Sequence, residues 1–406
     1  MTKKSDAPAI RFKGFSDAWE QREVGDLLIE RSQQAPMSDE YPLMAFIANE
    51  GVAPKGERYD RSALVTDTVN KLYKKTEKGD FIYSSNNLET GSIGLNKYGK
   101  ACISPVYSIF EPTGIADSDF LGRRLVRKDF INAMVKWRQG VIYGQWRIHE
   151  SDFLKIEISV PSVEEQRKIG AYLDQLDNLI TLHQRTFEKL TNVKKSMLEK
   201  MFPQNGSSYP EIRFKGFTDP WEQRKVSDLA EKTYGGGTPT TSNEAYWNGD
   251  IPWIQSSDVV DGKLLGVEPR KWITQDGLNN SAAQLIPGNS IAIITRVGVG
   301  KLAFMPYSYA TSQDFLSLSK LNAEPLFTVY ACYKKLQSEL NAVQGTSIKG
   351  ITKDELLAKN IMVPRYAEQQ QIGAFFKQLD HLITLHQREL EKLQNIKKSM
   401  LEKMFV

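Results

Sequence analysis

The sequence predicts an α+β protein: two globular mixed heads in tandem, each followed by a long helix. Two observations carry this prediction. Residues 165–202 recur as residues 368–405 at a constant offset of 203, with 28 of the 38 positions identical. A second repeat opens each half, because the 18 residues from Ile10 return from Ile212 with 14 identities. Repetition in register indicates two copies of one architectural unit.

Each copy of the longer repeat is expected to be a helix. Apolar residues recur from Ile169 onward at steps that alternate mostly between three and four, which is the helical period. Ser162 and Glu165 have the spacing of a capping box, and Pro203 follows the end of the repeat. About 37 residues at 1.5 Å each make a helix of roughly 55 Å. One apolar stripe on so long a helix favours pairing with the other copy; an ordinary core helix is the alternative.

Histidines occur at equivalent places on the two helices. His183 and His386 fall on the apolar stripe, and a hydrogen-bonded structural role is expected rather than catalysis. His381 stands where the first copy has Asn178, so a solvated side chain is expected there. With 2 cysteines and 4 scattered histidines, no metal-ligand spacing occurs.

Composition is that of a soluble globular protein, and 406 residues suffice for several domains. No apolar run has the length of a membrane span, and the first residues lack the apolar core of a signal peptide. Two cysteines do not make a disulfide framework, so a cytoplasmic protein is expected. The net charge of +4 is weak evidence for nucleic acid, so any DNA-binding surface has to be a local patch.

The repeats divide the chain into four parts. We expect a first head in residues 1–157, a helix and linker in 158–211, a second head in 212–360 and a second helix in 361–406. The variable parts of the heads, residues 28–150 and 230–350, show short β-like runs with turn residues between them, and they differ from one another. Matching scaffolds with different heads are typical of a reader with two sites.

Several motifs point to a known family. Ile-Ser-Val-Pro ends at Pro161 and Ile-Met-Val-Pro ends at Pro364, and each is followed by Glu-Gln and Ile-Gly. Further motifs are GGGTPTTS from Gly235, IPWIQSSD from Ile251 and QGTSIKGIT from Gln344. With these motifs and its repeated layout, essentially the whole chain resembles the DNA-specificity subunits of type I restriction-modification enzymes.

The resemblance implies two target-recognition domains, each reading one half of a bipartite site in double-stranded DNA. The two long helices would pack antiparallel as a spacer. Two modification subunits would bring S-adenosylmethionine for adenine methylation, and two restriction subunits would bring ATP and Mg²⁺ for translocation and cleavage. The chain itself would be non-catalytic and would bind no cofactor.

Two other classes remain open: an enzyme that methylates or cuts DNA by itself, and a coiled-coil scaffold for proteins. Adenine methylation needs Asn or Asp before Pro-Pro and an aromatic residue, and neither NPP nor DPP occurs. Residues 297–301, VGVGK, are followed by Leu302 rather than by the Ser or Thr of a phosphate-binding loop. A turn between two strands is expected there instead.

Base reading needs Arg, Lys, Asn, Gln, Ser or Thr on exposed loops, and the same donors bind phosphates without specificity. A solvated or turn-forming role is the alternative at each position. The first head lacks GGTP and IPW and has QGVIYGQWR from Gln139 in place of the last motif. Its candidates are Ser84, Ser85, Asn86, Asn87, Lys97, Lys100, Tyr143, Gln145 and Arg147. Those of the second head are Thr238, Thr240, Gln255, Ser256, Ser257, Arg296, Lys301, Ser312, Gln313, Thr346, Ser347 and Lys349.

Two further groups of residues have structural explanations as well. Trp19 and Trp221 lie in the repeated start segments, so they are expected to pack the scaffold or dock a partner rather than read bases. A basic cluster comprises Arg123, Arg124, Arg127 and Lys128. It is expected to form a solvated helix face, with phosphate contact as the alternative.

Overall fold

The computed structural model describes residues 7–54, 71–142, 145–204, 206–342 and 350–406. The chain forms two compact units, one of residues 1–182 with 390–406 and one of residues 183–389. Each unit contains one head, the first part of the long helix that follows it and the last part of the other long helix. Among the described residues, no helix is long and apolar enough to cross a membrane.

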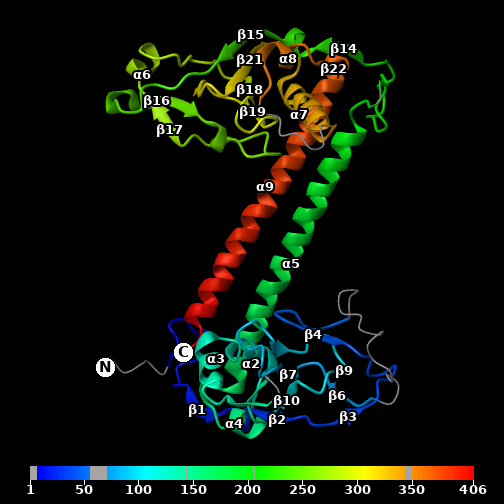
Figure 1. The fold of residues 1–406 in the computed structure, drawn as a ribbon, viewed down its shortest axis with the longest axis vertical. Helices are drawn as coiled ribbons and strands as arrows, with labels where there is room; N and C mark the ends of the chain where they lie inside the picture. Colours follow the sequence, from blue (N-terminus) through cyan, green and yellow to red (C-terminus); the bar gives the residue numbers. More distant parts are fainter. Residues whose placement is uncertain (1–6, 55–70, 143–144, 205, 343–349) are drawn as a thin grey trace. The chain divides into compact units, whose positions relative to one another are not determined.

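The first head is built on a four-stranded antiparallel sheet. Its strands are β1 (Glu20–Glu23), β2 (Leu28–Glu30), β3 (Gln34–Ala35), β4 (Ala45–Ile47), β5 (Gly51–Ala53), β6 (Tyr73–Thr76), β7 (Phe81–Tyr83), β8 (Ile93–Leu95), β9 (Ala101–Ile103), β10 (Ser108–Pro112), β11 (Gln139–Ile142), β12 (Gln145–Arg147) and β13 (Glu157–Val160). Its short helices are α1 (Val24–Leu27), α2 (Ser118–Arg124), α3 (Lys128–Val135) and α4 (Glu150–Leu154). The main sheet has the order β2-β10-β7-β8, and β1 pairs with β13 beside it (Figure 1).

The second head repeats this plan around a four-stranded sheet of its own. Its strands are β14 (Glu222–Lys225), β15 (Ala230–Gly235), β16 (Trp247–Ile254), β17 (Lys271–Ile273), β18 (Ser290–Ile294), β19 (Leu302–Met305), β20 (Ala310–Thr311), β21 (Phe315–Leu321) and β22 (Asn360–Val363). Its helical segments are η3 (Val226–Leu229), η4 (Glu244–Tyr246), η5 (Ser256–Asp258), α6 (Gln275–Asn279), α7 (Pro325–Ala342) and α8 (Lys353–Leu357). The order β15-β21-β18-β19 matches that of the first head, and β14 pairs with β22 as β1 does with β13. A further three-stranded sheet of this head, called the added sheet, has the order β17-β16-β20, and the first head has a three-stranded sheet of order β3-β6-β9.

The alternating side chains of β18 show how the main sheet of the second head is covered on both faces. Side chains of a strand point to opposite faces in turn. Ile291 and Ile293 pack in one cluster with Phe327 of α7, whereas Ala292 and Ile294 pack in another with Ile254 of β16. The main sheet therefore lies between α7 and the added sheet, and all five residues of β18 are buried.

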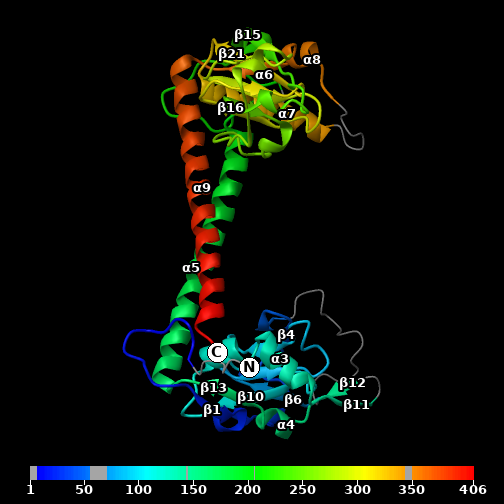
Figure 2. The ribbon, with the colours of Figure 1, turned by 90° about the vertical axis from the view of Figure 1, so that its left-hand side faces the viewer.

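The two long helices are α5 (Val163–Lys200) and α9 (Tyr366–Lys403), each two residues earlier than the repeat predicts. Figures 1 and 2 show them side by side in two perpendicular views. In the second unit Lys194 Nζ lies 2.5 Å from Asp380 Oδ1, and in the first unit Lys397 Nζ lies 2.5 Å from Asp177 Oδ1. Each pair joins a late residue of one helix to an earlier residue of the other, so the helices are antiparallel. The prediction of an antiparallel pair is confirmed.

The histidine predictions agree with the structure. His183 and His386 are half-buried, and their Nδ1 atoms lie 3.0 Å apart. One ring donates and the other accepts, which is the structural role that their places on the stripe predict. His381 is exposed, as expected of a solvated substitution.

The repeated start segments are packed against the ends of the long helices. Trp19 and Trp221 are 4% and 2% exposed, so they pack the scaffold. Trp221 contacts Phe202, the last residue of the first repeat, edge to face with ring centroids 5.9 Å apart. Burial on both sides of the contact explains why the start segment and the helix end recur together.

Helix α5 begins with half of the predicted capping box. Ser162 Oγ accepts a hydrogen bond from Glu165 N at 3.4 Å. The Glu165 carboxylate instead accepts two hydrogen bonds from Arg11, at 2.9 and 2.7 Å. The second unit repeats the pair as Arg213 and Glu368, with both bonds at 2.8 Å. A carboxylate near a helix N-terminus is favourable, and here it also fastens the start segment.

Arg123 and Arg124 of the basic cluster lie on α2 and do not form a solvated face. Arg123 bonds Asp174 at 2.7 Å and lies 3.0 Å from Asp177, both on α5. Arg124 is 7% exposed and lies 2.9 Å from Asp129. Arg123 therefore fastens the first head to α5, and Arg124 joins α2 to Asp129 of α3. Both arginines are already neutralised by carboxylates, so the expectation of a solvated face was wrong for these two, whereas Lys128 is exposed.

Candidate nucleic-acid interface

In the second head, strand pairing brings the predicted loops to one edge of the main sheet. β15 ends at Gly235, opposite Leu316 near the start of β21. β18 ends at Ile294, opposite Phe315 at the start of β21. The loops that follow β15 and β18 and the loop that precedes β21 therefore meet. They carry Thr238, Thr240, Arg296, Lys301, Ser312 and Gln313.

Direct hydrogen bonds join these loops. Thr238 Oγ1 donates to Gln313 Oε1 at 2.7 Å, and Gly237 N donates to Thr311 O at 2.8 Å. Ser312 N donates to Ile254 O at 2.9 Å. Gln255, Ser256 and Ser257 follow Ile254 directly, so they lie at the same edge of the sheet. Hydrogen bonds among three loops thus bring together six predicted positions: Thr238, Gln255, Ser256, Ser257, Ser312 and Gln313.

Arg296 projects from the turn that joins β18 to β19. Gly298 and Gly300 have φ of +92° and +95°, which explains the glycines and confirms the expected strand turn. Thr295 N donates to Asp314 O at 2.8 Å, and Ile351 N donates to Thr295 O at 2.8 Å. Residue 351 thus lies beside the Arg296 turn. Thr346, Ser347 and Lys349 lie outside the described residues.

The candidates of the second head differ in exposure. Thr238, Thr240, Ser257, Arg296 and Gln313 are exposed, and Gln255, Ser256 and Lys301 are half-buried. Ser312 is only 4% exposed, and its hydroxyl donates to Asp314 at 3.2 Å. Its side chain shapes the loop, so the expectation that it is exposed was wrong.

Sequence reasoning missed a cluster on the added sheet. Trp253 Nε1 donates to Gly237 O at 2.9 Å, and Trp247 Nε1 donates to Thr240 O at 3.3 Å. Lys271 Nζ lies over both indole rings. The signal available in the sequence was two tryptophans six residues apart directly after the Gly-rich loop. Its meaning depended on the pairing of β16 with β17.

In the first head, the turn after β7 meets the β11–β12 hairpin. Asn86 Oδ1 accepts from Trp146 N at 2.7 Å, and Ser85 Oγ accepts from Ile148 N at 3.1 Å. Two predicted groups are thus brought together, but these side chains hold the hairpin. Ser84 is 5% exposed, which contradicts the expected exposure, whereas Asn87 is exposed. Tyr143 lies outside the described residues, and only the strand position of Gln145 is described.

The three candidate cations of the first head have carboxylate partners. Lys97 lies 2.6 Å from Asp174, Lys100 bonds Glu40, and Arg147 lies 3.9 Å from Glu150. Arg147 is nonetheless 63% exposed at its side chain and belongs to the hairpin. Lys97 and Lys100 follow the far end of β8, so they are not gathered with the turn at residues 84–87. At that turn Arg138 donates to Glu89 and lowers the pKa of its carboxyl.

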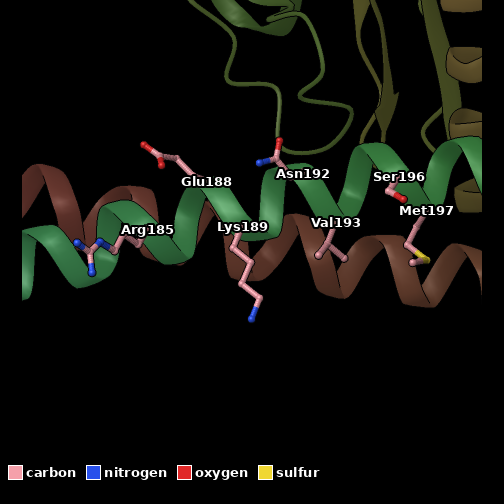
Figure 3. Close-up of a pocket in the computed structure, with 7 residues that line it drawn as sticks. All are labelled: Arg185, Glu188, Lys189, Asn192, Val193, Ser196 and Met197. Carbon is pink, nitrogen blue, oxygen red and sulfur yellow. The ribbon is translucent and has the colours of Figure 1, made fainter. Parts of the chain in front are cut away.

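Both cysteines of the chain are buried in the heads. Burial raises the pKa of the Cys332 thiol to about 12, and it raises the pKa of Cys102 as well. Among the described residues, no group of three or more His, Cys, Asp or Glu could hold a metal ion. A shallow depression lies on α5, and Figure 3 shows Glu188 and Asn192 on the opposite side of the helix from Lys189. Its lining comes from one helix only and contains neither His nor Cys.

Comparison with known proteins places this architecture. A profile described as the type I restriction modification DNA specificity domain matches residues 17–192 and again residues 218–395. The MjaVIII specificity subunit of Methanocaldococcus jannaschii is 23% identical over 94% of this chain and 91% of its own length. The EcoR124I/EcoR124II specificity subunit of Escherichia coli is 26% identical, over 57% of each chain. The MjaIX specificity subunit of M. jannaschii is 28% identical, and the match spans 44% of its length.

A solved structure shares the fold over nearly the whole chain. The S subunit of a type I restriction-modification system from M. genitalium has a TM-score of 0.60 at 12% identity, over 98% of this chain and 99% of that one. The two profile matches fall on the two halves that the internal repeat defines. This chain therefore belongs to the family of type I restriction modification DNA specificity domains, present here as two tandem copies.

Proposed function

We propose that this chain is the sequence-specificity subunit of a type I restriction-modification complex and that each head reads one half of a bipartite site in double-stranded DNA. The observation that carries the proposal is the gathering of exposed polar side chains at one edge of the second head's main sheet. Such donors and acceptors are the groups that recognise base edges. The first head offers the corresponding turn and hairpin.

In the proposed complex the chain performs no chemistry. Two modification subunits bring S-adenosylmethionine and methylate adenine, and two restriction subunits bring ATP and Mg²⁺ for translocation and cleavage. The complex acts in the cytoplasm on the cell's DNA. Support comes from the relatives, which are named as specificity subunits, and from the buried, raised-pKa cysteines, which are unsuited to nucleophilic attack.

The helices α5 and α9 set the number of unread base pairs between the half-sites in this proposal. Their antiparallel pairing is held by the repeated ion pairs Lys194–Asp380 and Lys397–Asp177. About one turn of DNA, roughly 10 base pairs from centre to centre, lets two readers meet the same groove face.

The test is a map of methyladenine in cells that express this chain with its modification subunits. One bipartite motif is expected, and it should vanish when the gene for this chain is deleted. The purified complex should bind that motif in preference to a scrambled duplex, with strong salt dependence. Methyl transfer by the isolated chain, or a motif that survives deletion of the gene, would contradict the proposal.

A further inference from the structure

We propose that Lys271, with Arg270 beside it, binds a DNA backbone phosphate next to the base-reading loops of the second head. The inference rests on the proposed function and adds to it a phosphate-binding site on β17 that the sequence motifs do not indicate. The partner chemistry is a phosphodiester of duplex DNA.

The position of Lys271 follows from a bulge in β16. Trp247 and Ile251 both pair with Ile273 of β17, so residues 248–250 are extruded between them. Asn248 has φ of +61°, and a Cβ on Gly249 would lie 2.5 Å from Ile273 O. The extrusion lets the Trp247 ring meet the Trp253 ring edge to face, with centroids 5.2 Å apart. Bulges of this kind re-aim side chains.

Lys271 is held by those two rings. Its Nζ lies 5.5 Å from the centroid of the Trp247 ring and 5.8 Å from that of Trp253. A cation over an indole face is stabilised by about 0.5–1 kcal/mol at an exposed site, which reduces the freedom of a long side chain. Lys271 is exposed, and within the described residues it has no carboxylate partner. A positioned ammonium without an anion is suited to a phosphate.

The same tryptophans hold the loop that carries Thr238 and Thr240. Their indole N–H groups donate to the backbone oxygens of Gly237 and Thr240. Lys271 is therefore coupled to the candidate reading loop through one layer of side chains. The face is continuous with the proposed interface, which is why DNA rather than a protein is the expected occupant.

Arg270 extends the positive charge along the same strand end. Its side chain is 68% exposed, and its Nε lies 3.5 Å from Asp258 Oδ1. The other oxygen of Asp258 accepts from Gln255 N at 3.0 Å and holds the turn with Ser256 and Ser257. Because substitution of Arg270 would disturb that turn, Lys271 is the better position for a test.

The experiment measures binding of the complex with its modification subunits to a duplex that contains the mapped site, at several salt concentrations. Loss of one phosphate contact lowers the slope of log K against log salt by about 0.9 and weakens binding about eightfold at 0.1 M salt. Lys271→Gln should show both the lower slope and the weaker binding. Lys271→Arg should bind with the affinity and the salt slope of the unsubstituted complex. Lys225→Gln is the matched control, because Lys225 is exposed on β14, on the opposite side of this head (Figure 1).

The outcomes separate the two levels of the proposal. An unchanged slope for Lys271→Gln, or a change equal to that of Lys225→Gln, overturns the phosphate site. A changed methylation motif in Lys271→Gln also overturns it, because the residue would then read a base. Absence of any sequence preference in the unsubstituted complex would instead refute the proposed function. Thermal unfolding of each variant confirms that the fold is intact.

Discussion

Arg213 and Arg296 lie in the same head in opposite electrostatic settings. Arg213 donates two hydrogen bonds to Glu368, whose side chain is 1% exposed. Arg296 is exposed at the sheet edge and makes no ion pair within the described residues. A charge that is already neutralised in the fold has little to offer a ligand, whereas an exposed arginine can meet a base or a phosphate. Arg213 is therefore part of the scaffold, and we propose recognition as the role of Arg296.

Substitution of Arg296 tests recognition. Arg296→Ala should weaken DNA binding through the second head. A base contact would cost about 1–3 kcal/mol and relax one position of the motif, whereas a phosphate contact would weaken all sequences and flatten the salt slope. Arg224→Ala is the control, since Arg224 is also exposed but bonds Glu222 on β14. Equal affinities of the two variants at every salt concentration would exclude Arg296 from the interface.

Substitution of Glu368 tests the scaffold. Glu368→Gln removes the anion from a buried, doubly bonded pair, and such losses cost about 3–5 kcal/mol. Chemical denaturation should show that loss for Glu368→Gln and partial recovery when Arg213→Met is added, because the second change removes the unpaired cation. A loss below about 1 kcal/mol would show that the pair contributes little net stability.

At the scale of elements, the long helices carry the repeated contacts. Lys194 pairs with Asp380, and their repeat equivalents Lys397 and Asp177 pair in the other unit. Tyr330 also donates to Asp380 at 2.6 Å, so the second head is bonded to the helix pair at the same place. The same Lys–Asp pair thus forms twice, with the roles of the two helices reversed. Both pairs can form only if Lys and Asp have the same spacing on each helix, which explains the constant offset of the repeat.

Lengthening the helices tests their role in spacing. Four residues inserted near His183, with a matching insertion near His386, lengthen each helix by about 6 Å and keep the apolar stripe nearly in register. The unread gap should grow by about one or two base pairs, at roughly 3.4 Å each, while both half-sites stay the same. Mapping of methyladenine measures the gap directly.

The control for this insertion lies in the linker. The same four residues placed within residues 203–210 leave both helices unchanged and should leave the gap unchanged. A soluble, active double insertion with the original gap would show that something other than these helices sets the spacing.

At the scale of the whole molecule, the two units have the same parts, but the chain connects those parts differently in each unit. Ile212 N donates to Lys200 O at 2.9 Å, and Ile10 N donates to Lys403 O at 3.0 Å. In the second unit the helix end and the start segment are joined by the linker. In the first unit they come from opposite ends of the chain. Each head is thus packed on an equivalent scaffold, which is consistent with the proposal that the heads read DNA independently.

Exchange of one head tests that independence. Replacement of residues 28–150 by the matching region of a relative should change one half of the methylated motif only, because the second head keeps its own loops and core cluster. The reverse exchange of residues 230–350 should change the other half. A motif that changes in both halves after either exchange would contradict the two-reader arrangement.

Patterns local in the sequence predicted the scaffold correctly. The repeats, the 3.6-residue period and the glycine turn before Lys301 anticipated α5, α9, their pairing and the β18–β19 turn, and the family resemblance supplied the antiparallel direction. They succeeded because helix periodicity and turn geometry depend on neighbouring residues. The burial of Trp19 and Trp221 was predictable for a similar reason, since they recur where the heads do not.

Sets of residues distant in the sequence needed the tertiary structure. Arg123 is neutralised by Asp174, 51 positions away, and Lys97 shares that carboxylate, so neither charge could be assigned from its neighbours. The place of Lys271 beside two indole rings depends on a bulge in β16, which no local sequence pattern indicates.

By itself, the sequence determined the two-fold repeat, the paired helices and the family, because repeats, helical periodicity and short motifs are all visible as residue spacing along the chain. Only the tertiary structure decided which polar side chains meet at a sheet edge, because strand register across long separations brings Thr238 to Gln313 and leaves Lys97 and Lys100 elsewhere. Exposure, ion pairing and the approach of loops are properties of packing, and packing is settled by contacts that no local pattern records.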